Sequence, residues 1–277
     1  MSAGAIVVTA LGLGLLAALG GFTGARAVGT LLAAHRGGAQ LWPENSLLAF
    51  RNAIALGADF LEFDVHLSKD GEVVVIHDPT VERTTTGAGA VSDRTLAELR
   101  TLRLKGRDGK GTEEAIPTLD EVVGLAAPTP VRLLLEIKVD ARGGRYPGIE
   151  EKALVILDRH GMAGRTIVMA FQEETVRRIR TLRPEVWVGG LYEKRDLAEM
   201  RSTVEREIER LRDAGARFIG LHQGLVTPDV VKQAEQAGLL LGVWTVNGAG
   251  AMKRFIEIGV GILITDRPDV AKELLGR

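Results

Sequence analysis

The chain has 277 residues, enough for one large domain with a substantial core or for two small ones. Its 35 basic and 36 acidic residues nearly cancel, so the charge balance gives no sign of a nucleic-acid-binding surface, and we expect no nucleic-acid partner. Cysteine is absent, which excludes disulfide bonds, thiolate nucleophiles and zinc–thiolate sites.

Residues 1–27 form a hydrophobic segment that differs in composition from the rest of the chain. No side chain from Ser2 to Ala25 is ionisable, and a helix of about 20 apolar residues is long enough to span a bilayer. We therefore predict a single membrane-anchoring helix over residues 3–25, and a membrane-anchored protein. Two alternatives stay open: a signal peptide cleaved near Ala25-Arg26-Ala27, which would give a secreted or periplasmic protein, and a buried helix.

After this segment, short apolar runs alternate with helical patterns. Strands are predicted at Thr30–Ala34, Asp59–Leu67, Glu72–Ile76, Val131–Ile137, Thr166–Ala170, Val186–Leu191, Phe218–Leu221, Leu239–Val246 and Val260–Thr265. Helices are predicted at Ser46–Leu56, Thr95–Leu102, Leu119–Ala126, Ile149–His160, Glu173–Leu182, Asp196–Ala214, Pro228–Ala237 and Ala249–Ile258. This alternation favours a mostly parallel sheet covered by helices. We predict that residues 28–277 form one α/β domain, a (β/α)8 TIM barrel preceded by the hydrophobic helix.

The nine predicted strands exceed the eight places of such a barrel. Asp59–Leu67 and Glu72–Ile76 are joined only by Ser68-Lys69-Asp70-Gly71, and Asp-Gly favours a tight turn over a crossover helix. One of the nine strands is therefore predicted to be an edge or irregular segment. Two polar stretches, Glu82–Asp93 and Lys105–Ala115, are predicted to be loops above the barrel mouth.

Charged or titratable side chains lie at the ends of four predicted strands. These residues are His35 and Arg36, then Glu62 and Asp64, then His77, then Glu136 and Lys138. The carboxyl ends of parallel barrel strands meet at one rim, which is where barrel enzymes hold their active sites. We therefore expect the seven side chains to share one site.

The three carboxylates of this set indicate a metal site. Glu62 and Asp64 are two residues apart on a strand, so both project from one face, and inside a barrel they would repel each other. A hard cation with oxygen ligands relieves this repulsion. Glu136 lies in an apolar run and needs a partner there. We predict one divalent cation, Mg²⁺ or Ca²⁺, bound by Glu62, Asp64 and Glu136; the alternative is that the carboxylates lie on a solvated face.

The two histidines at strand ends suit proton transfer. A single histidine is more often structural, but His35 and His77 lie on the same predicted rim, and an ordinary pKa near 6.5 suits a general base and a general acid. Arg36 and Lys138 add positive charge where an anion such as phosphate would bind. This set of residue types suits the cleavage of a phosphate ester.

A series of motifs runs through the chain in a fixed order. They are His35-Arg36-Gly37, Pro43-Glu44-Asn45-Ser46, Leu61-Glu62-Phe63-Asp64-Val65, Lys69-Asp70-Gly71, Val75-Ile76-His77-Asp78-Pro79, Arg83-Thr84-Thr85, Ile116-Pro117-Thr118-Leu119, Glu136-Ile137-Lys138, Val243-Trp244-Thr245-Val246-Asn247 and Ile264-Thr265-Asp266-Arg267-Pro268. Over about residues 30–272 they resemble the glycerophosphodiester phosphodiesterase family, which is related to the phosphatidylinositol-specific phospholipases C. The resemblance implies a (β/α)8 barrel that cleaves a glycerophosphodiester to glycerol 3-phosphate and an alcohol.

The resemblance also implies a role for each matching residue. His35 and His77 match the general base and acid, Glu62, Asp64 and Glu136 the cation ligands, and Arg36 and Lys138 the phosphate contacts. The implied route begins with attack by the glycerol 2-hydroxyl while one histidine removes its proton and the other protonates the leaving alcohol. Water then opens the resulting cyclic phosphate.

Two further matches are expected at the substrate. Glu44 is predicted to bind substrate, and Trp244 to pack on the glycerol or headgroup, unless it simply fills the barrel. Asn45 or Ser46 caps the following helix or has a substrate role. His66 is expected outside the site.

Three other functions are alternatives to this one. A lysophospholipase D acting on lysophospholipids is compatible with the apolar amino terminus. A non-enzymatic phosphodiester-binding surface protein would be expected to lack catalytic residues, and none is missing. A sphingomyelinase-like phospholipase D fits the Pro-Glu-Asn and Trp-Thr-Val-Asn motifs less well. The sequence leaves open the headgroup, the metal, the side of the membrane and the oligomeric state.

Overall fold

The computed structural model describes residues 29–277, so the predicted helix over residues 3–25 lies outside the described residues. The described residues form nine strands: β1 Leu31–His35, β2 Phe60–Leu67, β3 Val73–Val75, β4 Arg132–Ile137, β5 Thr166–Ala170, β6 Trp187–Tyr192, β7 Phe218–His222, β8 Leu240–Trp244 and β9 Ile262–Thr265. The strand order is β1-β9-β8-β7-β6-β5-β4-β2-β3, and an additional β1–β2 pairing closes the sheet. Eight of these strands pair in parallel, while β3 pairs with β2 in antiparallel fashion.

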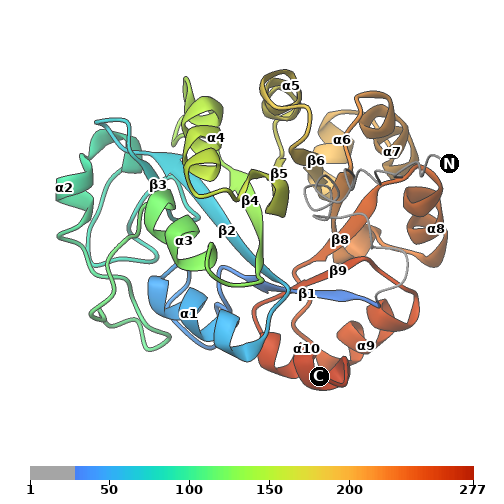
Figure 1. Ribbon diagram of the computed structural model, residues 1–277, viewed down its shortest axis with the longest axis horizontal. Helices are drawn as coiled ribbons and strands as arrows, with labels where there is room; N and C mark the ends of the chain where they lie inside the picture. The colour runs from blue at the N-terminus through green and yellow to red at the C-terminus, as the bar shows by residue number, and fades with distance from the viewer. Residues whose placement is uncertain (1–28) are drawn as a thin grey trace, which may run out of the picture.

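Helices surround the strands. Those of the described residues are α1 Leu47–Leu56, α2 Leu96–Leu99, α3 Leu119–Ala126, α4 Ile149–Arg159, α5 Glu173–Leu182, α6 Lys194–Glu199, α7 Val204–Asp213, α8 Pro228–Gln236, α9 Ala249–Glu257 and α10 Pro268–Leu274, with short 3-10 turns η1 Val91–Asp93, η2 Ala163–Arg165 and η3 Gln223–Leu225. Figure 1 shows the strands at the centre and the helices around them. The predicted (β/α)8 TIM barrel is confirmed for this part of the chain.

The surplus strand is β3. It follows β2 through a tight turn in which Gly71 has φ 80°, a conformation that glycine adopts without strain, so β2 and β3 form the predicted hairpin. The chain then builds a small unit beside β2, seen at the left of Figure 1, around its own apolar cluster, which includes Val74, Ile76, Val81 and Leu104. The two segments predicted as loops belong to this unit.

One predicted helix was wrong. Asp196–Ala214 was expected to be continuous, but it is split into α6 and α7. Arg201 has φ 50°, which a helix does not allow, and the Thr203 hydroxyl accepts a hydrogen bond from the Arg206 backbone N–H and so begins a new helix. The short final helix α10 was not predicted; it begins at Pro268, a residue suited to a first helical position.

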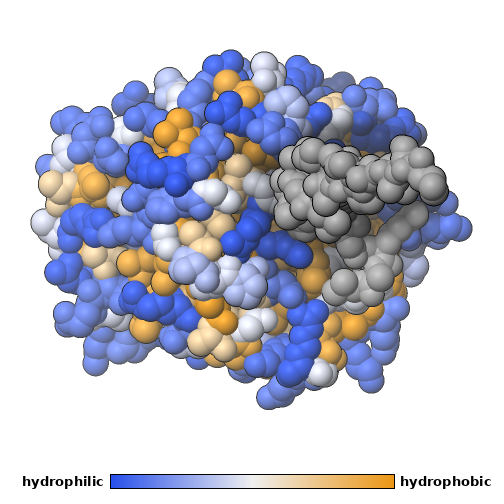
Figure 2. All heavy atoms as spheres, viewed as in Figure 1, coloured by the Kyte–Doolittle hydropathy of each residue, from blue (hydrophilic) through white to orange (hydrophobic). Residues whose placement is uncertain are grey.

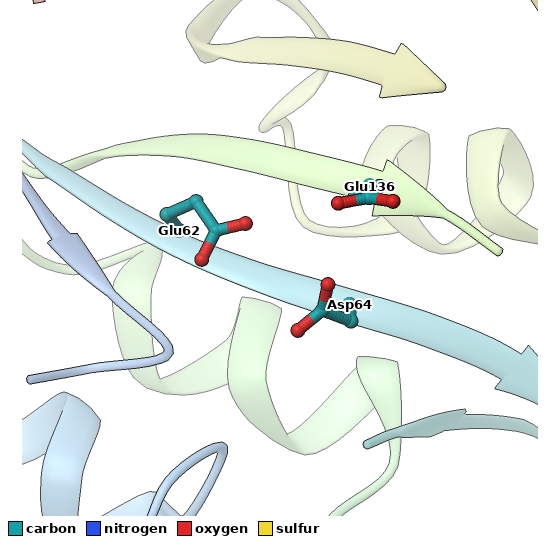
Figure 3. Close-up of side chains that lie close together, drawn as sticks. All are labelled: Glu62, Asp64 and Glu136. Carbon is teal, nitrogen blue, oxygen red and sulfur yellow. The ribbon is translucent and has the colours of Figure 1, made fainter. Parts of the chain in front are cut away.

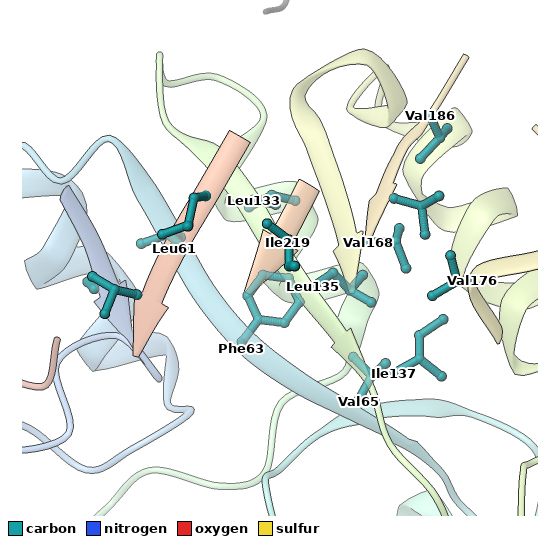
Figure 4. Packing of buried hydrophobic residues seen from close by; sticks show 14 of the residues in the cluster. Leu61, Phe63, Val65, Leu133, Leu135, Ile137, Val168, Val176, Val186 and Ile219 are labelled. Atoms are coloured by element: carbon teal, nitrogen blue, oxygen red, sulfur yellow. The ribbon is translucent and has the colours of Figure 1, made fainter. Parts of the chain in front are cut away.

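The core has two layers because alternate strand residues face opposite sides. Outward-facing residues of β2 and β4, such as Phe63 and Leu135, pack with residues of the surrounding helices, and Figure 4 shows part of this cluster. Inward-facing residues fill the barrel; they are Leu31, Ala33, Phe60, Leu134, Ile167, Met169, Leu191, Phe218, Ile262 and Ile264. On β2 and β4 the inward positions after Phe60 and Leu134 are carboxylates, so the apolar filling ends where the charged site begins.

The Phe218 ring requires glycines around it. A Cβ atom added at Gly242 would lie 2.9 Å from the ring, and one at Gly220 would lie 3.1 Å from it. At Gly189 an added Cβ would meet the Phe218 carbonyl oxygen at 1.9 Å. Gly220 and Gly242 therefore make room for the Phe218 ring, and Gly189 makes room for the Phe218 backbone.

The surface in Figure 2 is dominated by hydrophilic residues, with hydrophobic ones scattered between them. Residues 29–277 contain no helix that is both long enough and apolar enough to cross a membrane. The predicted anchor belongs to the part of the chain that is not described.

Candidate active site

A cavity of about 310 Å³ opens at the carboxyl ends of the barrel strands. It is lined by His35, Arg36, Glu62, His77, Glu136, Lys138, Met169, Phe171, Leu191, Glu193, Arg195, Trp244, Thr245 and Ile264. Seven of the nine predicted site residues are in this lining, and the other two, Glu44 and Asp64, contact members of it. A larger cavity, about 770 Å³, lies near the amino ends of β1, β8 and β9, but the described residues around it bring no histidine and no carboxylate cluster together.

Strand pairing brings the three predicted metal ligands together. Asp64 on β2 is the direct partner of Glu136 on β4, and Glu62 lies one inward position before Asp64. The ligand oxygens of the three residues lie within 4.8 Å of one another, and all three side chains are buried (Figure 3). The shared inward face, predicted from the two-residue spacing, is therefore confirmed.

The pKa values of the three carboxyl groups are shifted in different directions. Burial raises the pKa of Glu62 well above its usual range, and the Asp64 and Glu136 carboxylates add to the rise. Burial also raises the pKa of Glu136, although Lys138 opposes it. At Asp64 burial acts in the same direction, but Lys138, His77 and Arg36 together outweigh it and hold its pKa below its usual range.

The donor set fits a divalent cation. Asp64 Oδ1 and Glu136 Oε1 are buried, and the Lys138 ammonium is the cation that contacts them, 3.1 Å from the first and 2.5 Å from the second. Three buried carboxylates whose oxygens converge within 4.8 Å match the oxygen-rich ligand set of Mg²⁺ or Ca²⁺. The cluster could therefore hold one such ion, and nothing in it separates the two metals.

His35 is held in place by Asp266, a residue for which no role was predicted. Its Nδ1 lies 2.5 Å from Asp266 Oδ1, and Asp266 Oδ2 accepts a hydrogen bond of 2.6 Å from Asn247 Nδ2. Asp266 follows β9, which pairs with β1, so closure of the barrel brings together residues 231 positions apart. Burial lowers the pKa of His35, although the Asp266 hydrogen bond acts in the opposite direction.

His77 has a matching arrangement. Its Nδ1 lies 2.6 Å from Oδ1 of the next residue, Asp78, and Asp78 is in turn bound by Arg83. His66 does not line the cavity, as expected, yet its Nε2 lies 3.0 Å from the His77 carbonyl oxygen and its Nδ1 lies 3.0 Å from the Tyr146 hydroxyl. Since a carbonyl oxygen only accepts hydrogen bonds, His66 Nε2 carries a proton. The buried His66 ring therefore donates a hydrogen bond that holds the His77 backbone in place.

Arg36 contacts the carboxylate cluster through both backbone and side chain. Its backbone N–H donates to Glu62 Oε2 at 2.9 Å, with φ 51°, and its Nε lies 3.6 Å from Asp64 Oδ2. Its Nη1 donates to Glu44 at 3.1 Å. Glu44 also receives two hydrogen bonds from Arg83, so both of its oxygens are occupied by arginines. Its predicted contact with substrate stays a prediction.

Asn45 and Ser46, which follow Glu44, have different contacts. Ser46 caps α1 by accepting a hydrogen bond from the Ala49 backbone N–H, whereas Asn45 donates to Asp64 Oδ2 at 3.0 Å. Trp244 lies at the mouth, edge-on to Phe171 at 5.8 Å between ring centroids, and its buried Nε1 has no hydrogen-bond partner in the described residues. Sequence reasoning did not point to Phe171, because a single aromatic after a strand carries no distinguishing pattern.

The barrel is closed, and its carboxyl rim holds two histidines, each paired with a carboxylate, next to a buried cluster of three carboxylates. This is the architecture of a hydrolytic enzyme. The chain belongs to the glycerophosphoryl diester phosphodiesterase family, whose model matches residues 35–270. The predicted resemblance and enzyme class are confirmed.

Relatives match over most of their length. A glycerophosphodiester phosphodiesterase from Caldanaerobacter subterraneus subsp. tengcongensis is 36% identical over 247 residues, covering 89% of this chain and 98% of the relative. One from Bacillus subtilis (strain 168) is 32% identical over 256 residues, covering 87% and 84%. Among solved structures, an Oleispira antarctica phosphodiesterase in complex with the product sn-glycerol-3-phosphate aligns with a TM-score of 0.76 at 26% identity, covering 91% of this chain and 99% of that chain.

Proposed function

We propose that this chain hydrolyses glycerophosphodiesters to sn-glycerol 3-phosphate and an alcohol by acid–base catalysis between His35 and His77. The observation that carries the proposal is that both imidazoles line one cavity with each Nδ1 on a carboxylate, beside Arg36 and Lys138. The names of the relatives and the product bound to the Oleispira antarctica enzyme support the substrate class.

The carboxylates fix how the histidines work. A carboxylate only accepts hydrogen bonds, so in the neutral rings Nδ1 carries the proton and Nε2 keeps its lone pair. His35 is the more enclosed of the two, with a side chain 13% exposed against 30% for His77. We assign the enclosed His35 as the base and His77, nearer to solvent, as the acid for the departing alcohol.

The proposed reaction has two steps. In the first, the neutral His35 takes the proton of the glycerol 2-hydroxyl at Nε2 as the hydroxyl oxygen bonds to phosphorus. His77 begins this step as the imidazolium and gives its Nε2 proton to the alcohol oxygen as the bond from that oxygen to phosphorus breaks. In the second, water opens the cyclic phosphate with the two histidines in reversed roles. Arg36 and Lys138 neutralise the phosphate oxygens throughout, because fixed positive charge favours the developing anion.

A divalent cation held by Glu62, Asp64 and Glu136 would supply charge neutralisation and make a nearby hydroxyl more acidic. Two residues of the chain orient the carboxylates whether or not the metal is bound. The Arg36 backbone N–H donates a hydrogen bond to Glu62, and the Asn45 side chain donates one to Asp64. The lysophospholipase D and binding-protein alternatives gain no specific support from the described residues.

The test is an assay of the metal-stripped protein with glycerophosphocholine and, in parallel, lysophosphatidylcholine, each with Mg²⁺ or Ca²⁺ restored. Release of glycerol 3-phosphate from glycerophosphocholine is expected with at least one of the metals, and His35→Ala should abolish it. Turnover of the lysolipid alone, or of neither substrate in the presence of bound metal, would contradict the proposal.

A further inference from the structure

We propose that Arg83, through Asp78, is the positioning residue that holds His77 for proton transfer. The inference rests on the proposed role of His77 as the acid. Arg83 lies outside the cavity lining and belongs to a sequence motif, Arg83-Thr84-Thr85, whose purpose the catalytic scheme leaves unexplained.

The Arg83 guanidinium grips two carboxylates at once. Its Nε and Nη2 donate to the two oxygens of Asp78 at 2.5 and 3.1 Å, and its Nη1 and Nη2 donate to the two oxygens of Glu44, each at 2.8 Å. Both contacts are bidentate, which adds directional specificity to the charge attraction. One guanidinium thereby fixes the plane of each carboxylate.

The orientation of the Asp78 carboxylate depends on its hydrogen bonds with Arg83. Among the described residues, only His77 and Arg83 make hydrogen bonds to its carboxylate, and it lies in a loop rather than in a strand. The equivalent carboxylate behind His35 is held differently: Asp266 is bound by the amide of Asn247. Arg83 therefore supplies for His77 the support that Asn247 supplies for His35.

The loop that carries Arg83 is itself well fixed. Thr85 is fully buried and donates through both its backbone N–H and its hydroxyl to the Val81 carbonyl, at 3.0 and 2.7 Å. Val81 is also fully buried in the small apolar cluster beside β2. The guanidinium is thus placed by a rigid turn, although half of its side chain is exposed.

The Arg83 side chain also connects the segment that follows His35 with the loop that carries His77. Glu44, gripped by Arg83, also accepts from Arg36, the residue after His35. The chain of contacts therefore runs from Arg36 through Glu44, Arg83 and Asp78 to His77. Lysine could keep the charge at position 83 but could not form two bidentate contacts, since its ammonium is a point charge without a planar fork.

Two substrates with different leaving groups separate positioning of the acid from loss of the fold. Choline leaves as an alkoxide that needs protonation, whereas p-nitrophenolate leaves without it. Glycerophosphocholine and glycerophospho-p-nitrophenol are therefore compared in wild type, His77→Ala, Arg83→Lys and Arg83→Gln. The matched control is Arg178→Lys, because Arg178 has a similarly exposed side chain and grips Glu151 away from the cavity.

His77→Ala should lose roughly 10²- to 10⁴-fold in the single-turnover rate of choline release from glycerophosphocholine and far less in that of p-nitrophenol release. The single-turnover rate of alcohol release is measured because it reports the first step alone and excludes the later opening of the cyclic phosphate, in which His77 acts as the base. Both Arg83 variants should show the same selectivity at a smaller scale, about 10- to 100-fold, because misplacing a catalytic group by about 1 Å costs about that much. Arg178→Lys should leave both rates unchanged. Because the ratio of the two rates is measured on one sample, partial unfolding lowers both and leaves the ratio intact.

Suppose that His77→Ala shows the selective loss, but the Arg83 variants lose activity equally on both substrates or lose none. This result would overturn the role of Arg83 and leave the proposed function standing. No selectivity in His77→Ala would overturn the assignment of the acid and the inference with it. Arg83→Lys combined with Asp78→Asn should cost little more than the larger single loss, because both changes release the same imidazole; fully multiplicative losses would also contradict the inference.

Discussion

The strongest consequence of the His35–Asp266–Asn247 geometry is the expected effect of Asp266→Asn, a change of one atom. The Asp266 carboxylate now accepts at both oxygens, from His35 and from Asn247 Nδ2. Asparagine has only one oxygen, so at one of these contacts the new N–H₂ group faces a group that donates a hydrogen bond in the wild-type protein. Asn247 cannot rotate to help, because its Oδ1 already accepts from the Asp266 backbone N–H at 2.9 Å.

Each arrangement open to the variant weakens the base. If the new amide N–H₂ faces His35, Nδ1 must accept, the proton moves to Nε2, and no lone pair is left there. If it faces Asn247 instead, Nε2 keeps its lone pair but two donors oppose each other, so this productive arrangement lies about 1–3 kcal/mol above the unproductive one. The His35 imidazolium also loses an anionic partner in the transition state, worth about 1 kcal/mol over a neutral one. The sum, about 2–4 kcal/mol, predicts a fall of roughly 30- to 1000-fold in kcat.

The assay is the steady-state release of glycerol 3-phosphate from glycerophosphocholine, with circular dichroism to confirm the fold. Asp269→Asn is the matched control: it weakens an ion pair with Arg267 just beyond the site, at 2.8 Å, and should keep wild-type activity. Asp266→Asn within threefold of wild type, when His35→Ala is inactive, would refute the claim that Asp266 sets the tautomer of His35.

Three further outcomes follow. Glu136→Gln should raise the Mg²⁺ or Ca²⁺ concentration for half-maximal activity by more than about 100-fold, since loss of an outer partner alone costs about 10- to 100-fold; an unchanged requirement in a metal titration would remove Glu136 from the ligand set. Gly189→Ala should lower the free energy of unfolding by about 3 kcal/mol or more, because the added Cβ would meet the Phe218 carbonyl oxygen at 1.9 Å. Gly250→Ala is the control, because an added Cβ there meets no atom within 4 Å. Thermal denaturation compares the two variants, and equal melting temperatures would contradict the packing argument. The full chain should sediment with membranes and a chain starting at residue 28 should not; fractionation in which both behave alike would refute the anchor over residues 3–25.

Much of the site could be predicted because local spacing determines it. The two-residue period of a strand puts Glu62 and Asp64 on one face, and the apolar run before Glu136 indicates a buried neighbour. The Asp-Gly turn identified the pair of strands that could not both belong to the barrel, and β3 is the member left outside.

The supporting residues could not be assigned from the sequence, because closure of the barrel places them. Asp266 reaches His35 only because β9 pairs with β1, and Arg83 reaches Glu44 only because the unit beside β2 folds back toward the first loop. Neither pairing leaves a periodic pattern in the chain. The break between α6 and α7 was missed because the helical spacing of apolar residues continues across it, and only Thr203, a good capping residue, marks the new start.

In the proposed mechanism, His35 and His77 cleave a glycerophosphodiester through its own 2-hydroxyl. The most direct measurement is phosphorus NMR of the metal-loaded protein with glycerophosphocholine and with the analogue that lacks this hydroxyl. We expect a cyclic glycerol phosphate that gives way to glycerol 3-phosphate from the first substrate, and no cleavage of the second. Cleavage of the analogue at a comparable rate, or phosphocholine as the product, would contradict it.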